Sequence, residues 1–104
     1  MAFSATNRWG ACYPNPRVNR LRQLLQSIDI TDDEHTDVSL KHETEWCLSA
    51  FPSGRLVWEN VEDEEDNPRH MVQISRERVL DLWLKLARED LAPVEAEPWR
   101  PGHG

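Results

Sequence analysis

Two histidines in the middle of the chain, His42 and His70, could act as metal ligands. Imidazole nitrogen is a common ligand of zinc, and both nitrogens of a shared site must lie about 2 Å from the ion. In the strand order derived below, the two residues are three strands apart, which is roughly 14 Å at about 4.8 Å per strand. We therefore expect no shared metal ion, and we predict a hydrogen bond between His70 and Asn60 at the edge of the core.

The chain has two cysteines, Cys12 and Cys47, with no second cysteine near either. This spacing is not that of a zinc knuckle or of a dense disulfide framework, so we expect two free thiols. Lys41 is predicted to lie opposite Cys47 and would favour a reactive thiolate, but Glu59 on the other side would oppose it. No histidine is expected on that face of the sheet, so Cys47 is interpreted as a half-buried structural thiol.

Two acidic runs, DDEHTD at residues 32–37 and EDEED at residues 62–66, contain carboxylates that could bind a hard cation. Neither has the spacing of a calcium loop, DxDxDG with a distant glutamate, and both are typical of solvated charge runs. The Walker loop, GxGxxG and GxSxG are absent from the sequence. Because no nucleophile, base and stabilising group are predicted on one surface, we expect neither enzymatic activity nor a cofactor or metal.

The net charge of −7 is unevenly distributed along the 104 residues. Arg8, Arg17, Arg20 and Arg22 precede residue 29 without any acidic residue, and all 19 acidic residues follow. A body so rich in carboxylates repels phosphate backbones, so nucleic acid is not an expected partner. A basic protein partner is compatible with this charge.

The length predicts a single domain over residues 1–104 with one core. No run approaches the roughly 20 apolar residues that cross a bilayer, so we expect no membrane association. The first residues, MAFSATNRWGACYPNP, lack the charged-then-apolar order of a signal peptide. We therefore expect a cytoplasmic protein.

The N-terminal part is predicted to be an irregular arm over residues 1–14, followed by a helix over residues 16–27. Asn15 is expected to cap this helix and Pro16 to occupy its first position. Apolar residues then recur at spacings of three and four: Val18, Leu21, Leu25 and Ile28.

The C-terminal part is predicted to form a helix over residues 76–90 with Ser75 as its cap, and an extended tail over residues 91–104. The helix has an apolar arc wider than one sheet face can cover. We expect its surplus, around Leu82 or Leu84, to contact the first helix, the tail or another subunit. Trp99 is the expected anchor of the tail.

Between the helices, residues 37–75 are predicted to form an antiparallel sheet. The turn at 51–54 ends in Gly54, which suits a three-residue hairpin loop. The pairs that keep apolar side chains on one face are Ala50 with Leu56, Leu48 with Trp58, Trp46 with Asn60, Leu40 with Leu48, Val38 with Ala50, Trp58 with Val72, and Leu56 with Ile74. On the other face, Ser49 is expected to pair with Val57, and Cys47 with Glu59.

The resulting fold class is α+β: an N-terminal helix, a four-stranded antiparallel β-meander, and a C-terminal helix packed on one sheet face. A more polar layer is expected at the sheet end next to the acidic 59–66 segment, formed by His42, Trp46, Asn60 and His70.

Three functional hypotheses follow. The first is a non-enzymatic inhibitor or immunity-type module that docks a basic partner through its acidic loops. Its predicted contact residues are Glu59, Glu62, Asp63, Glu64, Glu65, Asp66, Asp32, Asp33 and Glu34. The second is a small-ligand binding or sensing domain whose pocket is formed by His42, Trp46, Asn60 and His70. The third is a homodimeric structural subunit that associates through its C-terminal helix.

Overall fold

A computed structural model describes residues 3–28, 37–60, 62 and 68–102 of the chain. The described elements, in chain order, are β1 (Phe3–Thr6), β2 (Cys12–Pro14), α1 (Val18–Ser27), β3 (Val38–His42), β4 (Trp46–Ala50), β5 (Leu56–Asn60), β6 (Arg69–Met71), α2 (Arg76–Ala87), α3 (Leu91–Glu95) and β7 (Arg100–Pro101).

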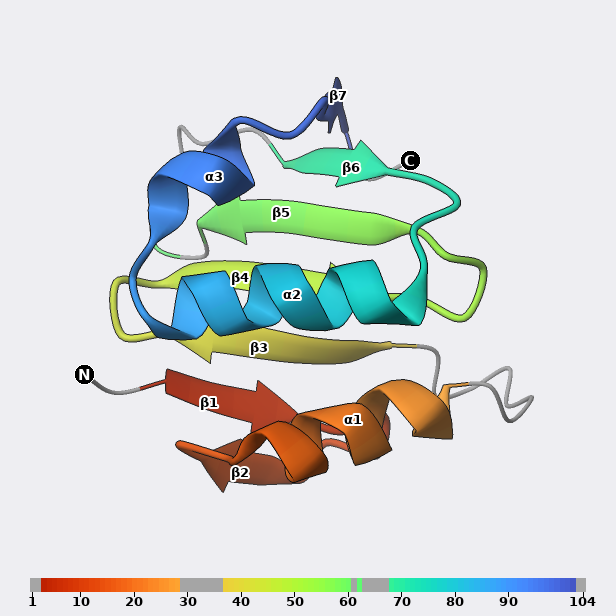
Figure 1. Ribbon diagram of the computed structural model, residues 1–104, viewed down its shortest axis with the longest axis vertical. Coiled ribbons are helices and arrows are strands. Elements are labelled where there is room, and N and C mark those ends of the chain that lie inside the picture. The colour runs from red at the N-terminus through yellow and green to blue at the C-terminus, as the bar shows by residue number, and fades with distance from the viewer. Residues whose placement is uncertain (1–2, 29–36, 61, 63–67, 103–104) are drawn as a thin grey trace.

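The strands form one antiparallel sheet in the order β2-β1-β3-β4-β5-β6-β7. The three helices of the described part of the chain lie on one face of this sheet, with α2 over its centre and α1 and α3 to either side (Figure 1). The predicted mixture of helices and an antiparallel sheet is confirmed. The sheet is wider than the predicted four-stranded meander, because both ends of the chain add strands to it.

The predicted register of the three central strands is confirmed. Leu40 pairs with Leu48 and Val38 with Ala50, and all five predicted pairs between β4 and β5 are present. Gly54 adopts a left-handed backbone with φ +89°, and an added Cβ would lie 3.3 Å from the backbone of Gln73. The left-handed backbone therefore favours glycine at this turn, and a larger side chain would also be crowded by Gln73.

The predicted register of β6 is wrong. Trp58 pairs with Arg69 instead of Val72, and Leu56 pairs with Met71 instead of Ile74. The shift of three residues is odd, so every side chain of β6 changes face. Met71 is 5% exposed and Val72 46% exposed. The strand ends at Met71 because Gln73 has a left-handed φ of 58° and the next amide, Ile74 N–H, donates to the Gly54 carbonyl at 2.9 Å.

The predicted irregular arm over residues 1–14 is also wrong, because β1 and β2 form a hairpin at the edge of β3. The side chain of Asn7 closes its loop by accepting hydrogen bonds from Trp9 N–H at 3.0 Å and Ala11 N–H at 2.9 Å. Arg8, in the same loop, is buried and donates to the Ser27 carbonyl at the end of α1. These strands of three and four residues are too short to show a sustained period in the sequence.

Helix α1 begins at Val18, two residues later than predicted, and Asn15 does not cap it. Asn15 has a left-handed φ of 46°, and its Oδ1 accepts a hydrogen bond from Phe3 N–H at 3.1 Å. The asparagine therefore secures the hairpin. The N-cap residue of α1 is Arg17, whose side chain makes no capping hydrogen bond. The predicted apolar stripe is buried at Leu21, Leu25 and Ile28.

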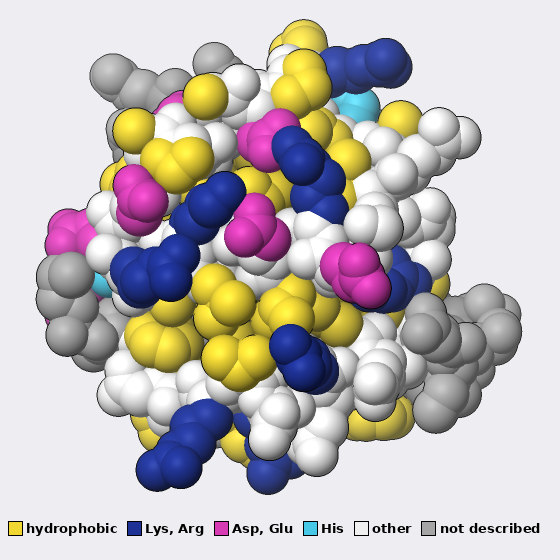
Figure 2. All heavy atoms as spheres, viewed as in Figure 1, with side chains coloured by type: hydrophobic (Ala, Val, Ile, Leu, Met, Phe, Trp, Pro, Cys, Tyr) yellow, Lys and Arg dark blue, Asp and Glu magenta, His cyan; other side chains and the backbone are white. Residues whose placement is uncertain are grey.

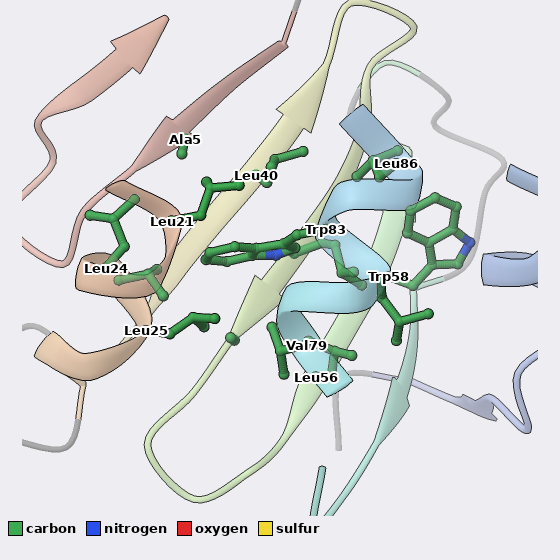
Figure 3. Packing of buried hydrophobic residues seen from close by; sticks show 14 of the residues in the cluster. Ala5, Leu21, Leu24, Leu25, Leu40, Leu56, Trp58, Val79, Trp83 and Leu86 are labelled. Carbon is green, nitrogen blue, oxygen red and sulfur yellow. The ribbon is translucent and has the colours of Figure 1, made fainter. Parts of the chain in front are cut away.

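Helix α2 has the predicted cap, since Ser75 Oγ accepts from Arg78 N–H at 3.2 Å, and it ends at Ala87 rather than at residue 90. Its wide apolar arc contacts α1, α3 and the central strands β3 and β4. The Trp83 indole extends from α2 over the sheet toward the leucines of α1, and the Trp58 indole lies on the other side of α2 (Figure 3). Both indoles are fully buried in one hydrophobic core.

The predicted extended tail is only partly correct, because it contains the short helix α3 and the edge strand β7. Pro93 is compatible with α3 because it lies in the first turn, where backbone N–H groups have no helical partner. Trp99 does anchor the tail: its Nε1 donates to the Val94 carbonyl at 2.8 Å, and its ring stacks on Trp58 at 6.2 Å.

Among the helices that the structure describes, none combines the length and the apolarity needed to span a bilayer.

Candidate functional site

The structure describes only some of the acidic residues that are predicted to bind a partner. Asp63, Glu64, Glu65, Asp66, Asp32, Asp33 and Glu34 lie outside the described residues. Glu59 is half-buried on β5, opposite Cys47 and on the sheet face away from the helices. Glu62 is exposed just beyond β5, and its N–H donates to Asn60 Oδ1 at 3.1 Å.

The end of β5 is tied to the turn between β3 and β4, because Asn60 Nδ2 donates to the Thr44 carbonyl at 3.3 Å. That turn contributes Glu43, which is exposed, and Glu45, which forms an ion pair with Lys41 at 3.4 Å. We call Glu43, Glu45, Glu59 and Glu62 the acidic end of the sheet. In Figure 1 this turn and the end of β5 lie on the same side of the molecule, to the left.

Two members of the acidic end, Glu43 and Glu45, were not among the predicted contact residues. The sequence does contain the necessary signal, since a three-residue loop at 43–45 follows from the pairing of Leu40 with Leu48. Such a loop must leave the sheet at the end where β5 also finishes. Glu45 closes it in a left-handed conformation, with φ 72°, and its N–H donates to the His42 carbonyl at 2.9 Å.

The predicted polar layer is incomplete, because His70 does not belong to it. Trp46 does pair with Asn60, and His42, the last residue of β3, directly precedes the turn that leads to Trp46. His70 instead pairs with Val57 on the opposite face of the sheet. It forms a hydrogen bond with the Gly102 carbonyl at 3.0 Å rather than with Asn60. The two histidines therefore lie on opposite faces and cannot bind one ion.

His42 is fully buried, and its hydrogen bonds are local. Its Nδ1 accepts from Thr44 N–H at 3.2 Å and also lies 2.9 Å from Thr44 Oγ1. The accepting role of Nδ1 places the proton of the neutral ring on Nε2. This Nε2 has no hydrogen-bond partner among the described residues. His42 thus holds the β3–β4 turn, and it is closed off from solvent.

The space beside Trp46 is filled by the chain itself. Trp46 stacks on Trp58 with ring centroids 4.5 Å apart, and the Arg69 guanidinium lies 5.7 Å from the Trp46 ring. Glu95 of α3 accepts from Trp58 Nε1 at 3.0 Å with one oxygen and from Arg69 Nη1 at 2.8 Å with the other. These contacts close the sheet end where a ligand pocket was predicted.

Two hollows of the surface lie elsewhere. One, of about 580 Å³, lies between α1 and α2. The other, of about 430 Å³, lies beside the start of α1, where Arg20 packs over the Tyr13 ring. Neither is lined by any residue of the predicted polar layer.

Both cysteines are free, and Cys12 is exposed whereas Cys47 is buried. Burial raises the pKa of the Cys47 thiol, and Glu59 raises it further, while hydrogen bonds from Ser49 and Ser39 and the charge of Lys41 lower it. At neutral pH the thiol is therefore protonated and a poor nucleophile. The described residues contain no group of three or more His, Cys, Asp or Glu side chains placed to hold a metal ion.

Comparison with known proteins assigns no family. No protein-family model matches the chain, and no curated protein or solved structure matches it. Function is therefore inferred from the residues and the geometry of this chain alone.

Proposed function

We propose that this protein is a non-enzymatic binding module, of the inhibitor or immunity type, that docks a basic protein partner through the acidic end of its sheet. The observation that carries the proposal is the convergence of Glu43, Glu45, Glu59 and Glu62 at one end of the sheet. The run of five acidic residues at 62–66 follows directly from that end in the sequence.

Electrostatics supports a protein partner more strongly than a small ligand. Four carboxylates, those of Glu43, Glu45, Glu59 and Glu62, converge at the acidic end, and Lys41 forms an ion pair with one of them, Glu45. A concentration of one sign of charge accelerates the encounter with an oppositely charged protein by roughly tenfold to a thousandfold. Such association weakens as salt screens the charges.

The other predicted acidic run, Asp32 to Glu34, precedes β3 in the sequence and lies outside the described residues. The acidic end includes Glu43, which follows β3. Asp37 and Glu43 flank this strand of five residues, whose length is roughly 17 Å. We assign the main contact to the acidic end, and the 32–34 run becomes a natural control.

The test is a matched pair of triple charge reversals. The variant E62K/E64K/E65K reverses Glu62 of the acidic end and two acids that follow it in the sequence, and D32K/D33K/E34K makes the same change in net charge in the other acidic run. Tagged wild-type protein and both variants are used to capture partners from the native cell, and the captured proteins are identified by mass. We expect wild type and the 32–34 variant to capture the same basic protein, and the 62–65 variant to lose it.

Binding of the purified partner is then measured against salt concentration. We expect the association rate to fall by roughly tenfold or more from low to high salt, with little change in dissociation. Equal capture by both variants, or a partner that is not basic, would contradict the proposal.

The ligand-binding hypothesis has less support. Its pocket would need Trp46 and His42 to line open space, but Trp46 is covered by Trp58 and Arg69, and His42 is fully buried. A thermal-shift screen remains its direct test, because a ligand at 100 times its dissociation constant stabilises a protein by about 2.7 kcal/mol.

A further inference from the structure

A groove between α1 and α2 lies on the helical face of the protein, and the acidic end does not explain it. Its volume is about 580 Å³. Helix α1 contributes Arg22, Leu25 and Gln26 to it, and α2 contributes Arg76, Glu77, Leu80, Asp81 and Leu84.

The floor of the groove is apolar. Leu25 is buried, and Leu80 and Leu84 are half-buried, so part of each of these two α2 side chains faces solvent. Figure 2 shows a band of hydrophobic side chains between α1 and α2, with charged side chains on both sides of it. A contiguous apolar surface bordered by charges is typical of a contact between proteins.

The two walls carry opposite charge. Helix α1 contains arginines and no acidic residue, and Arg22 is exposed at the groove. On the α2 side, Glu77 and Asp81 are exposed, and Asp81 is paired with Lys85 at 2.9 Å. Within residues 3–28, 37–60, 62 and 68–102, neither Arg22 nor Glu77 takes part in an ion pair.

The remaining arginine of the groove is already engaged. Arg76 donates to the Pro52 carbonyl at 3.0 Å and to the Phe51 carbonyl at 3.3 Å. It is thereby held against the β4–β5 turn at one end of the groove. Among the charged side chains of the groove that are held neither by an ion pair nor by these carbonyls, the α1 wall offers Arg22 and the α2 wall offers Glu77.

We propose that this groove is an interface between two copies of the chain, related by a two-fold axis that runs along the groove. Such an axis lays α2 of each copy over α1 of the other. Leu80 and Leu84 of the two copies then meet at the centre, and Arg22 of each copy faces Glu77 of the other.

Self-association accounts for the opposite charges of the two groove walls, whereas a partner protein with charge of one sign does not. A basic or an acidic protein would complement one wall and be repelled by the other. In a two-fold interface the same surface patch is used by both copies, so opposite charges on its two sides are self-complementary. The proposal does not depend on the acidic end, and its failure would leave the proposed partner binding unaffected.

The first test is the mass of the protein in solution, measured by light scattering and sedimentation over a range of concentrations. We expect a dimer that dissociates on dilution, because an interface of about 800 Å² per copy with few buried anchors binds weakly. Leu84→Glu is expected to abolish the dimer. A circular dichroism spectrum checks that the variant still folds.

The second test uses charge reversal in trans. Arg22→Glu places two acids opposite each other in its own dimer, and Glu77→Arg places two bases opposite each other, so each variant alone is expected to dimerise at least about tenfold more weakly. Mixing the two variants restores both opposite-charge contacts, and a heterodimer is expected. A pairing of Arg22 with Glu77 within one chain cannot produce this rescue.

The matched control is Arg17→Glu, which makes the same charge change on the exposed residue that directly precedes α1 and does not line the groove. It is expected to dimerise like the wild type. The proposal is overturned by a protein that stays monomeric up to about 1 mM, well above the dissociation constants of specific interfaces. It is also overturned if the mixed variants fail to associate, or if Arg17→Glu weakens the dimer as much as Arg22→Glu.

Discussion

The centre and the edge of the sheet are held together in different ways. At the centre, β3, β4 and β5 are joined by short connections, 43–45 and 51–55. The Trp83 indole of α2 donates to the Leu48 carbonyl of β4 at 3.0 Å. At the edge, β6 follows a long acidic connection. There the Trp58 indole and Arg69 both donate to one carboxylate, that of Glu95 in α3.

This difference between the centre and the edge shows what sets the register of a strand. Short loops leave few ways to pair two strands, so the register at the centre is a local property. The connection between β5 and β6 has eight residues, 61–68, and therefore allows many ways to pair these two strands. At the edge the register is therefore decided by contacts with distant segments, including Gly54, Glu95 and Gly102.

The largest expected loss of unfolding free energy comes from a substitution at the centre of the sheet. Trp83→Ala removes a fully buried indole, which typically costs about 3 to 5 kcal/mol of unfolding free energy. Denaturant unfolding followed by circular dichroism measures it. Trp9→Ala is the control, because Trp9 is 57% exposed and the change should stay within about 0.5 kcal/mol. Similar losses for both variants would contradict the described core.

The register of β6 is tested by two neighbouring alanine substitutions. Met71→Ala empties a buried position and should cost about 2 kcal/mol or more, whereas Val72→Ala changes a residue that is 46% exposed and should cost less than about 0.5 kcal/mol. Unfolding free energies measured under the same conditions decide the order. The reverse order would support the register expected from the sequence, with Val72 toward the core.

The contact that secures the edge is tested at Glu95. Glu95→Ala leaves Trp58 Nε1 without its acceptor, and we expect a loss of about 1 kcal/mol, since the carboxylate is partly exposed. Glu95→Gln keeps one acceptor oxygen, and it should lose about half as much. Unfolding measurements on both variants check this. An equal loss for alanine and glutamine would show that the hydrogen bond to Trp58 contributes little.

The smallest expected effect concerns the two thiols, one at the centre and one on the edge strand β2. Burial raises the pKa of Cys47 above the ordinary value of about 9, so the folded state keeps this proton to a higher pH than the unfolded state. The unfolding free energy therefore decreases as pH rises above that value. Cys47→Ala should show a shallower alkaline decrease, measured by unfolding from neutral to alkaline pH.

The matched control for this prediction is Cys12→Ala, because Cys12 is exposed. Its alkaline decrease should be the same as that of the wild type. If Cys47→Ala and the wild type lose stability in parallel, the thiol is not protected by burial.

Much of the centre could be predicted from residues close together in the sequence. The alternation through 46–50 and 56–60, together with Gly54, led to the correct pairs of β4 and β5, and Ser75 led to the correct cap of α2. The expected contact surface was less predictable. Glu59 and Glu62 were included for their charge, but Glu43 and Glu45 were missed because their place beside the end of β5 follows from strand pairing and not from an acidic run.

The central turns and the Ser75 cap of α2 could be predicted from the sequence, because they depend on side chains within a few residues of one another. Only the tertiary structure decided what the ends of the chain do. The open edge of β3 pairs with β1, and the open edge of β6 pairs with β7. Each edge offers unpaired backbone N–H and carbonyl groups that any suitable segment can satisfy. Which segment does so depends on packing across the whole core, as with Trp58 and Glu95, 37 residues apart.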